Sequence, residues 1–298
     1  MELRHLRYFV ATAQAQSFTK AAQALHIAQP PLGQQIRALE QEVGTSLFLR
    51  QGRGVVLSDA GAVFLTLALD ILARVEQAKK EAVRAANGEL GTLVLGFTES
   101  ASFNEAVTQL ISRYQQAYPD VGLTLLEDNS EALIRQLRQG ELDAAIVRPP
   151  FSDTDGLVFH ILSEEPLMVV LPSCHSLARR ECVCLKDLRY ERFVLYARQS
   201  GRGLSADIVA ECRAQGFNPL INQQAPQVSS AVNLVSAGLG VAIVPASMQR
   251  MQRPGLAFRT LVLERPQAVL GLATPAHQPR TVVQRLVECA EGVHTEEG

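Results

Sequence analysis

The sequence predicts three parts: a small helical head that ends in a β-hairpin, one long helix, and a larger α/β region of two lobes. Apolar residues recur at helical spacing over the first 43 residues. A single apolar stripe then continues from Ala60 to about Ala86, and from Leu93 onward short apolar runs alternate with helical patterns. We expect domains at 1–58, 59–88 and 89–298, the last with lobe I at about 89–163 and 269–298 and lobe II at about 164–268.

The head contains three expected helices, at Leu3–Gln14, Thr19–Leu25 and Pro30–Glu42. Ser17 or Thr19 can cap the second, since a hydroxyl accepts from the free N–H groups of a first helical turn. The third begins with two prolines, which are tolerated there because their missing N–H has no intrahelical partner. Its apolar positions fall on one side, so its polar side chains form an exposed face.

Two short strands and the long helix follow. Residues 48–50 and 54–57 predict a hairpin, or wing, around Gln51-Gly52-Arg53. Ser58-Asp59 then cap a helix that runs from Ala60 to about Ala86. A lone helix cannot bury its own apolar stripe, so we expect it to pack against a second copy of the chain. The expected dimerisation residues are Phe64, Leu67, Ile71, Val75 and Ala78.

The remaining residues alternate between expected strands and helices. The expected strands are 93–97, 121–126, 144–147, 167–171, 193–196 and 241–244, and the helices between them include 104–117, 130–139 and 204–215. This alternation predicts parallel sheet with helical crossovers. The length, about 205 residues, exceeds one small lobe, so two lobes with a cleft between them are expected.

Composition excludes several classes of protein. Hydrophobic residues make up 47% and charged residues 19% of the chain, which is typical of a folded α/β protein. Neither a stretch of about 18 apolar residues nor a signal peptide is evident, which predicts a cytoplasmic protein without a membrane partner. Residues 1–58 hold six basic and three acidic residues, +3, so with a net charge of −2 the remainder carries −5. A basic head suits contact with nucleic acid.

No chemistry of an enzyme or a cofactor stands out. Cys182 and Cys184 invite a zinc or redox interpretation, but no second pair of ligands has the right spacing. Residues 17–20 match S-x-x-K, yet they start the second helix of the head. No phosphate-binding, nucleophile-elbow or dinucleotide motif occurs. We expect no enzyme activity, no cofactor and no metal.

Together these features resemble the LysR-type transcriptional regulators over nearly the whole chain. The phrases "SFTKAAQALHIAQPPLGQQIRALE" and "LFLR…LSDAG" resemble the family's winged helix-turn-helix, and "HIAQPP" is similar to regulators of aromatic catabolism. "LVLGF", "YPDVGLTLLE", "GELDAAIVRPP" and "LVSAGLGVAIVPAS" are similar to its effector domain, which is like a periplasmic binding protein. The resemblance implies double-stranded DNA, a small-molecule effector, RNA polymerase and a homodimer or homotetramer as partners.

The DNA-binding residues are expected on the third helix and around it. Gln29, Gln34 and also Gln35 are candidates to read bases, since an amide both donates to and accepts from adenine. The candidates for phosphate contacts are Thr19, Lys20, Arg37 and Arg50. Arg53, at the tip of the wing, is the candidate for the minor groove. Gly33 stands where the family usually has serine, which leaves the detailed operator sequence open. The expected DNA-binding set is Thr19, Lys20, Gln29, Pro30, Pro31, Gly33, Gln34, Arg37, Arg50 and Arg53.

The effector residues are expected at strand ends and helix starts that face the cleft. By resemblance the role falls on Ser100, Ser130, Arg148, Gly203, Leu204, Val228 and Ser229, and we add Ser102 and Arg202. Arg148 and the helix N-termini suit an aromatic or unsaturated carboxylate. Glu99 would repel such an anion unless it points away or pairs with Arg148 or Arg202. A cationic, neutral or redox signal therefore stays open. The alternative of a protein that only binds a solute would explain the region from Leu93 onward but not residues 1–58.

Overall fold

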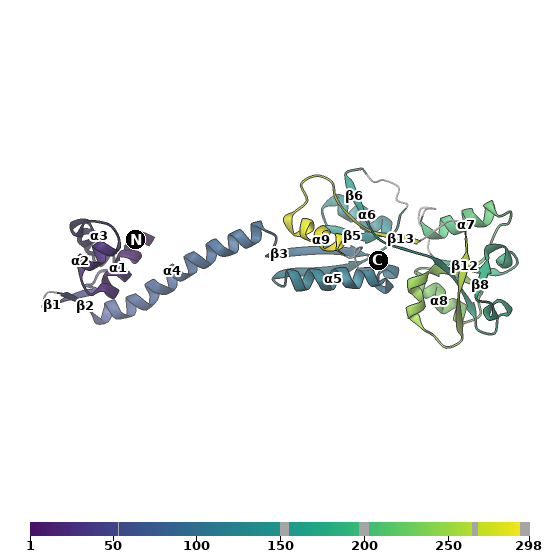
Figure 1. The fold of residues 1–298 in the computed structure, drawn as a ribbon, viewed down its shortest axis with the longest axis horizontal. Helices are drawn as coiled ribbons and strands as arrows, with labels where there is room; N and C mark the ends of the chain where they lie inside the picture. The colour runs from purple at the N-terminus through teal and green to yellow at the C-terminus, as the bar shows by residue number, and fades with distance from the viewer. Residues whose placement is uncertain (53, 150–154, 197–202, 264–267, 293–298) are drawn as a thin grey trace. The chain divides into compact units, whose positions relative to one another are not determined.

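The structure is a computed structural model that describes residues 1–52, 54–149, 155–196, 203–263 and 268–292 (Figure 1). The chain divides into two compact units, Met1–Arg84 and Ala85–Gly298. In the described part, no helix has the length and apolar character needed to cross a membrane.

Unit 1 follows the order predicted for the head. Its elements are α1 (Leu3–Ala15), α2 (Phe18–Ala24), α3 (Gln29–Val43), β1 (Phe48–Gln51), β2 (Gly54–Leu57) and α4 (Asp59–Ala86), which extends two residues beyond the unit. The core is one cluster that includes Phe9, Leu32 and Ile36. The strands pair antiparallel, with Phe48 opposite Leu57.

Three local contacts fix the hairpin and the start of α4. The Glu40 carboxylate accepts from the amides of Leu47 (2.8 Å) and Phe48 (3.1 Å), which ties β1 to α3. Ser58 accepts from the Gly61 amide at 2.9 Å and thereby caps α4. A Cβ at Gly61 would lie 2.0 Å from the Leu47 carbonyl oxygen, so only glycine permits this close approach.

Lobe I of unit 2 is a five-stranded sheet in the order β4-β3-β5-β13-β6. Its elements are β3 (Gly91–Phe97), η1 (Glu99–Phe103), α5 (Glu105–Ala117), β4 (Val121–Glu127), α6 (Ser130–Gln139), β5 (Ala144–Val147), β6 (Leu157–Glu165), β13 (Ala268–Pro275) and α9 (Thr281–Glu291). Because side chains alternate along a strand, Ala144 and Ile146 of β5 meet α5 and α9, whereas Ala145 and Val147 meet α6.

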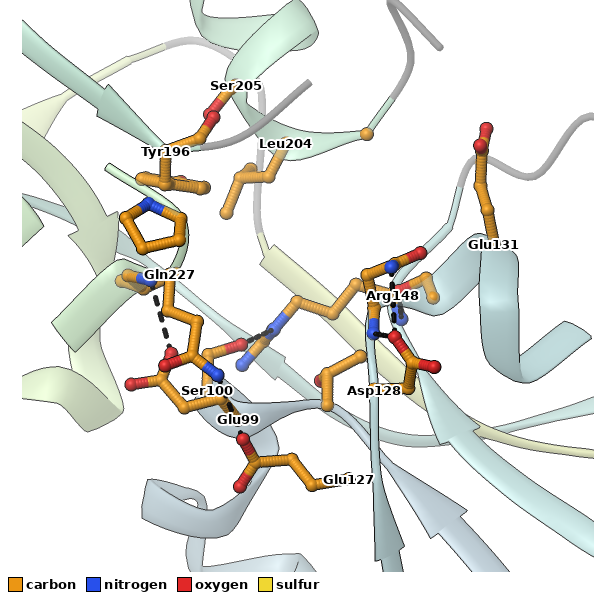
Figure 2. A pocket seen from close by; sticks show the side chains of 16 residues that line it. Glu99, Ser100, Glu127, Asp128, Glu131, Arg148, Tyr196, Leu204, Ser205 and Gln227 are labelled. Atoms are coloured by element: carbon orange, nitrogen blue, oxygen red, sulfur yellow. Dashed lines mark hydrogen bonds between the residues drawn. The ribbon is translucent and has the colours of Figure 1, made fainter. Parts of the chain in front are cut away.

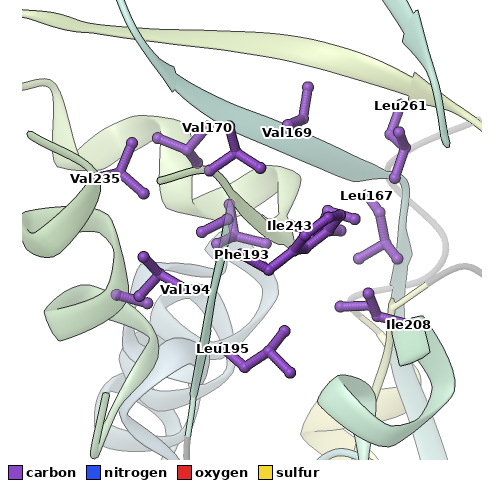
Figure 3. Packing of buried hydrophobic residues seen from close by; sticks show 14 of the residues in the cluster. Leu167, Val169, Val170, Phe193, Val194, Leu195, Ile208, Val235, Ile243 and Leu261 are labelled. Carbon is purple, nitrogen blue, oxygen red and sulfur yellow. The ribbon is translucent and has the colours of Figure 1, made fainter. Parts of the chain in front are cut away.

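Lobe II holds a four-stranded sheet in the order β11-β7-β12-β8 and the pair β10-β9. Its elements are β7 (Leu167–Pro172), η2 (Ser176–Arg179), β8 (Cys182–Cys184), η3 (Leu185–Leu188), β9 (Arg192–Tyr196), α7 (Leu204–Ala214), β10 (Leu220–Ala225), α8 (Val228–Ser236), β11 (Ala242–Pro245), η4 (Ala246–Met251) and β12 (Leu256–Val262). Phe193, Val169 and Ile243 lie in its core (Figure 3).

The expected parallel sheet is correct only in part. Strand β3 pairs parallel with β4 and β5, but β13 runs antiparallel to both β5 and β6. The register explains this difference. Ala268, where the chain re-enters lobe I, pairs with Glu165, where it leaves. Strand β13 starts beside the end of β6, so β13 must run in the direction opposite to β6. In lobe II, β7 is likewise antiparallel to β11 and β12.

Candidate functional site

The outer face of α3 carries the polar side chains predicted to contact DNA. Leu32, Ile36 and Leu39 are buried on the opposite side of this helix, and helical geometry therefore turns the polar positions outward. Gly33 is half-buried with open space around its Cα, and Arg53 lies outside the described residues. The exposed members of the predicted set are Thr19, Lys20, Gln29, Pro30, Pro31, Gln34, Arg37 and Arg50.

Two of the glutamines already have side-chain partners. The Thr19 hydroxyl donates to Gln29 Oε1 at 3.1 Å, so α2 orients the amide at the first turn of α3. Gln35 is half-buried, with its Oε1 2.7 Å from His5 Nε2. Since His5 Nδ1 accepts from the Glu2 amide, the Nε2 proton is directed to Gln35. Gln35 therefore ties α1 to α3.

Helix α4 presents a free apolar flank beside the one that packs on its own head. Phe64 and Leu72 are half-buried against the head core, and the Phe64 ring meets Phe9 at 5.1 Å between centroids. Leu67 and Ile71 are 54% and 39% exposed. A groove of about 430 Å³ at the start of α4 is lined by Val43, Leu47, Asp59, Ala60, Val63, Phe64 and Leu67.

Unit 2 contains a cavity of about 460 Å³ lined by residues of both lobes (Figure 2). This volume suits a small organic molecule. Lobe I supplies Thr98, Glu99, Ser100, Glu127, Asp128, Asn129, Ser130, Glu131 and Arg148. Lobe II supplies Tyr196, Gly203, Leu204, Ser205, Pro226, Gln227 and Val228.

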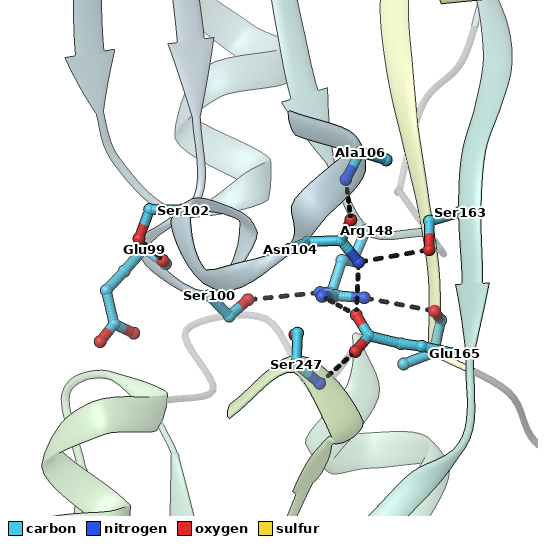
Figure 4. Close-up of polar contacts among 10 residues, drawn as sticks. Glu99, Ser100, Ser102, Asn104, Ala106, Arg148, Ser163, Glu165 and Ser247 are labelled. Carbon is cyan, nitrogen blue, oxygen red and sulfur yellow. Dashed lines mark hydrogen bonds and ion pairs between the residues drawn. The ribbon is translucent and has the colours of Figure 1, made fainter. Parts of the chain in front are cut away.

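Arg148 lies at the end of β5 and is buried in a network of polar contacts (Figure 4). Its Nη2 donates to Glu165 Oε1 at 2.7 Å, its Nε to the Ser100 hydroxyl at 3.2 Å and its Nη1 to the Ala268 carbonyl at 3.3 Å. Glu165 also accepts from Asn104 Nδ2 at 3.1 Å and from the Ser247 amide of lobe II at 2.6 Å.

This network determines the ionisation of Glu165. Burial alone would raise the pKa of the Glu165 carboxyl, but the Arg148 guanidinium and the Ser247 amide together hold that pKa below its usual range. Glu165 is therefore a carboxylate at neutral pH. The positive charge of Arg148 is compensated inside the protein.

Glu99 binds the start of α8. Its Oε2 accepts from the Val228 amide and its Oε1 from the Ser229 amide, both at 3.1 Å. The first N–H groups of a helix have no intrahelical partner and attract anions. A carboxylate of lobe I thus occupies the N-terminus of a lobe II helix.

The comparisons with known proteins agree with both parts of this description. Residues 3–62 match the model "Bacterial regulatory helix-turn-helix protein, lysR family", and residues 86–294 match "LysR substrate binding domain". The chain belongs to the LysR family of transcriptional regulators. This LysR-type regulator is thus a DNA-binding protein with an effector-binding domain.

Relatives and solved structures resemble it along nearly its full length. It is 39% identical to the uncharacterised regulator YnfL of Escherichia coli, over 96% of each chain, and 37% identical to BudR of Raoultella terrigena, over 97% of this chain and 99% of that one. Full-length CbnR complexed with target DNA has a TM-score of 0.86, at 26% identity, and covers 98% of this chain and 99% of its own. The BenM effector-binding domain with benzoate has a TM-score of 0.62 at 27% identity, and the match covers 70% of this chain and 94% of that one.

Most of the predicted effector residues of this LysR-type regulator come together. Ser100, Ser130, Arg148, Gly203, Leu204 and Val228 line the cavity. The Ser229 amide is bonded to Glu99 beside it. Ser102 is exposed, is not among the lining residues and donates to the Glu99 carbonyl, and Arg202 lies outside the described residues. Glu99 accepts from the first amides of α8, an arrangement that we did not predict from the sequence.

Sequence reasoning missed the residues that set the charge of the site. Glu165 ends a strand that we did not predict, so nothing marked it as the partner of Arg148. Glu127 and Asp128 follow a predicted strand, and this position at a strand end was the available signal. Tyr196 closes β9, where burial raises the pKa of its phenol and keeps it protonated at neutral pH. Within the described residues no cluster of ligands that could hold a metal occurs.

Proposed function

We propose that this LysR-type regulator reads an operator through α3 and changes its activity when a small molecule enters the cavity of unit 2. Gln29 and Gln34 contact base edges in the major groove, because residues near the N-terminus of a recognition helix reach them. Lys20, Arg37 and Arg50 contact phosphates. The resemblance to the DNA-bound CbnR structure supports this assignment.

Self-association is the second part of the proposal. The free flank of α4 exposes Val63, Leu67 and Ile71 to water, and a second copy would bury it. Two copies would place their recognition helices on two half-sites. A homodimer or homotetramer of this kind would act on transcription together with RNA polymerase.

The signal belongs to one of three chemical classes. An aromatic or unsaturated carboxylate is supported by the likeness to the BenM domain with benzoate and by the serine hydroxyls of the cavity. A cationic or neutral molecule is supported by the compensated charge of Arg148 and by Glu99 on α8. A redox signal would act on Cys182 and Cys184, both exposed at the two ends of β8.

The observation that carries the proposal is the exposed polar face of α3 opposite a buried apolar face. The test is selection of genomic DNA fragments by the full-length protein, followed by footprinting of the recovered sites. We expect discrete protected sites that a Gln29→Ala/Gln34→Ala/Arg37→Ala variant no longer protects. Recovery of random fragments by both proteins would contradict the proposal.

A further inference from the structure

The place where an effector carboxylate would bind α8 is already occupied. Glu99 accepts from two consecutive amides, Val228 and Ser229, at the start of a nine-residue helix. These amides and the positive end of the helix dipole are what a bound anion would use. An entering carboxylate would have to displace Glu99 or lie beside it, in repulsion with it.

The rest of the described lining is also acidic. It contains four carboxylates, of Glu99, Glu127, Asp128 and Glu131, and one guanidinium, of Arg148. Arg148 is neutralised by Glu165, which does not line the cavity. Glu127 accepts from Gln227 Nε2 at 2.9 Å and Asp128 from the Asn129 amide at 2.7 Å. These partners are uncharged, so the negative charges of Glu127 and Asp128 remain.

Two residues of the lining carry hydroxyl oxygens that are buried away from the cavity itself. Thr98 Oγ1 and Tyr196 OH have no hydrogen-bond partner among the described residues, although both residues are only 9% exposed. Leu204, Pro226 and Val228 supply apolar surface for the body of the ligand.

We propose that Glu99 is a specificity-determining residue: it closes the α8 N-terminus to carboxylates, so that the cavity selects a small organic amine, bound as its ammonium ion. Glu127 and Asp128 attract the ammonium group and accept its hydrogen bonds. The inference rests on the proposed function, which makes this cavity the effector site.

The test uses calorimetry on the full-length protein at pH 7 with matched probes. Three amines (benzylamine, cyclohexylmethylamine and butylamine) are each compared with the amide and the carboxylate of the same body. We expect at least one amine to bind ten times or more tightly than its carboxylate. Glu99→Ser frees the α8 amides, so the variant should gain tenfold or more in carboxylate affinity and lose amine affinity. Glu99→Gln, which keeps the length of the side chain, should reduce the preference for amines in the same direction.

Two controls separate the possible failures. Glu105→Gln removes one acidic charge outside the cavity lining and should leave the selectivity unchanged. Leu204→Trp fills the cavity and should abolish binding of every probe. If Leu204→Trp leaves binding intact, the proposed effector site is wrong. The amine proposal is overturned if the parent binds carboxylates as tightly as amines or binds no amine. It is also overturned if both Glu99 variants keep the selectivity of the parent. None of these outcomes contradicts the assignment of the cavity as the effector site.

Discussion

At the scale of single residues, Gln29 is the sharpest test of how this regulator recognises DNA. It is exposed at the first turn of α3, and Thr19 fixes the carbonyl end of its amide. We predict that Gln29→Ala lowers the preference for the selected operator over random DNA by about 1–3 kcal/mol, because one bidentate base contact is lost. Competition binding measures this ratio.

The matched control for Gln29 is Gln41→Ala, an exposed glutamine near the other end of α3. It should leave the preference unchanged, since it lies far from the helix N-terminus that we propose enters the groove. An unchanged ratio in Gln29→Ala would remove Gln29 from the set of base-reading residues.

Lys20 and Arg50 should behave differently from Gln29. Both are exposed cations, and a phosphate contact is independent of sequence. We predict that Lys20→Ala and Arg50→Ala each weaken binding to all DNA and reduce the slope of log K against log salt by about one unit. Filter binding across a salt series measures the slope. A loss confined to the operator would instead make these residues base contacts.

The cavity shows what sequence could and could not predict for individual residues. Ser100, Ser130 and Arg148 were predicted by resemblance to the family, and each also follows a recognisable strand or starts a helix. The partner of Arg148 was not predicted, because Glu165 is 17 positions away and pairs with it at 2.7 Å only in the folded chain. Charge compensation between distant residues leaves no local pattern in a sequence.

At the scale of elements, periodicity located most of the helices but not all of the strands, and helix α9 (Thr281–Glu291) was not among the predicted elements. The stripe along α4 and the buried run of β5 were strong signals. Strand β10 has five exposed positions out of six, and β6 alternates irregularly, so neither carries a clear period. The predicted dimerisation stripe also combined two flanks, since Phe64 packs on its own head while Leu67 and Ile71 face water.

The free flank of α4 makes a prediction about assembly. Leu67→Lys/Ile71→Lys should leave unit 1 folded, because both side chains are exposed within it. The lysines would place like charges in the interface between two copies, which is costly without a partner charge. We expect sedimentation to show a smaller species with weaker operator binding. Thr66→Lys/Ala73→Lys, at exposed positions outside both apolar flanks of α4, should keep the assembly. A native assembly in the Leu67/Ile71 variant would place the interface elsewhere.

At the scale of the whole molecule, Glu165 is held by Arg148 within lobe I and accepts from the Ser247 amide of lobe II, and its ionisation makes stability depend on pH. The pair lies between η1 of lobe I and η4 of lobe II, where Ser247 donates to Glu165. Glu165→Gln leaves the Arg148 charge buried without its counter-ion, which typically costs about 3–5 kcal/mol. Urea unfolding followed by circular dichroism should show this loss at pH 7. Glu165→Gln/Arg148→Met removes both charges and should recover much of it.

The sign of the pH dependence follows from the lowered pKa of Glu165. A carboxyl whose pKa is lower in the folded state contributes stability that is present above its ordinary value, 4.5, and is lost as the pH falls through the folded value. The parent should therefore become less stable as the pH falls below 4.5, and the Glu165→Gln curve should be flatter there. Glu105→Gln, at an exposed ion pair with Arg250, should follow the parent curve. If Glu165→Gln were as stable as the parent at pH 7 and equally sensitive to acid, the pair would not stabilise the junction between the lobes.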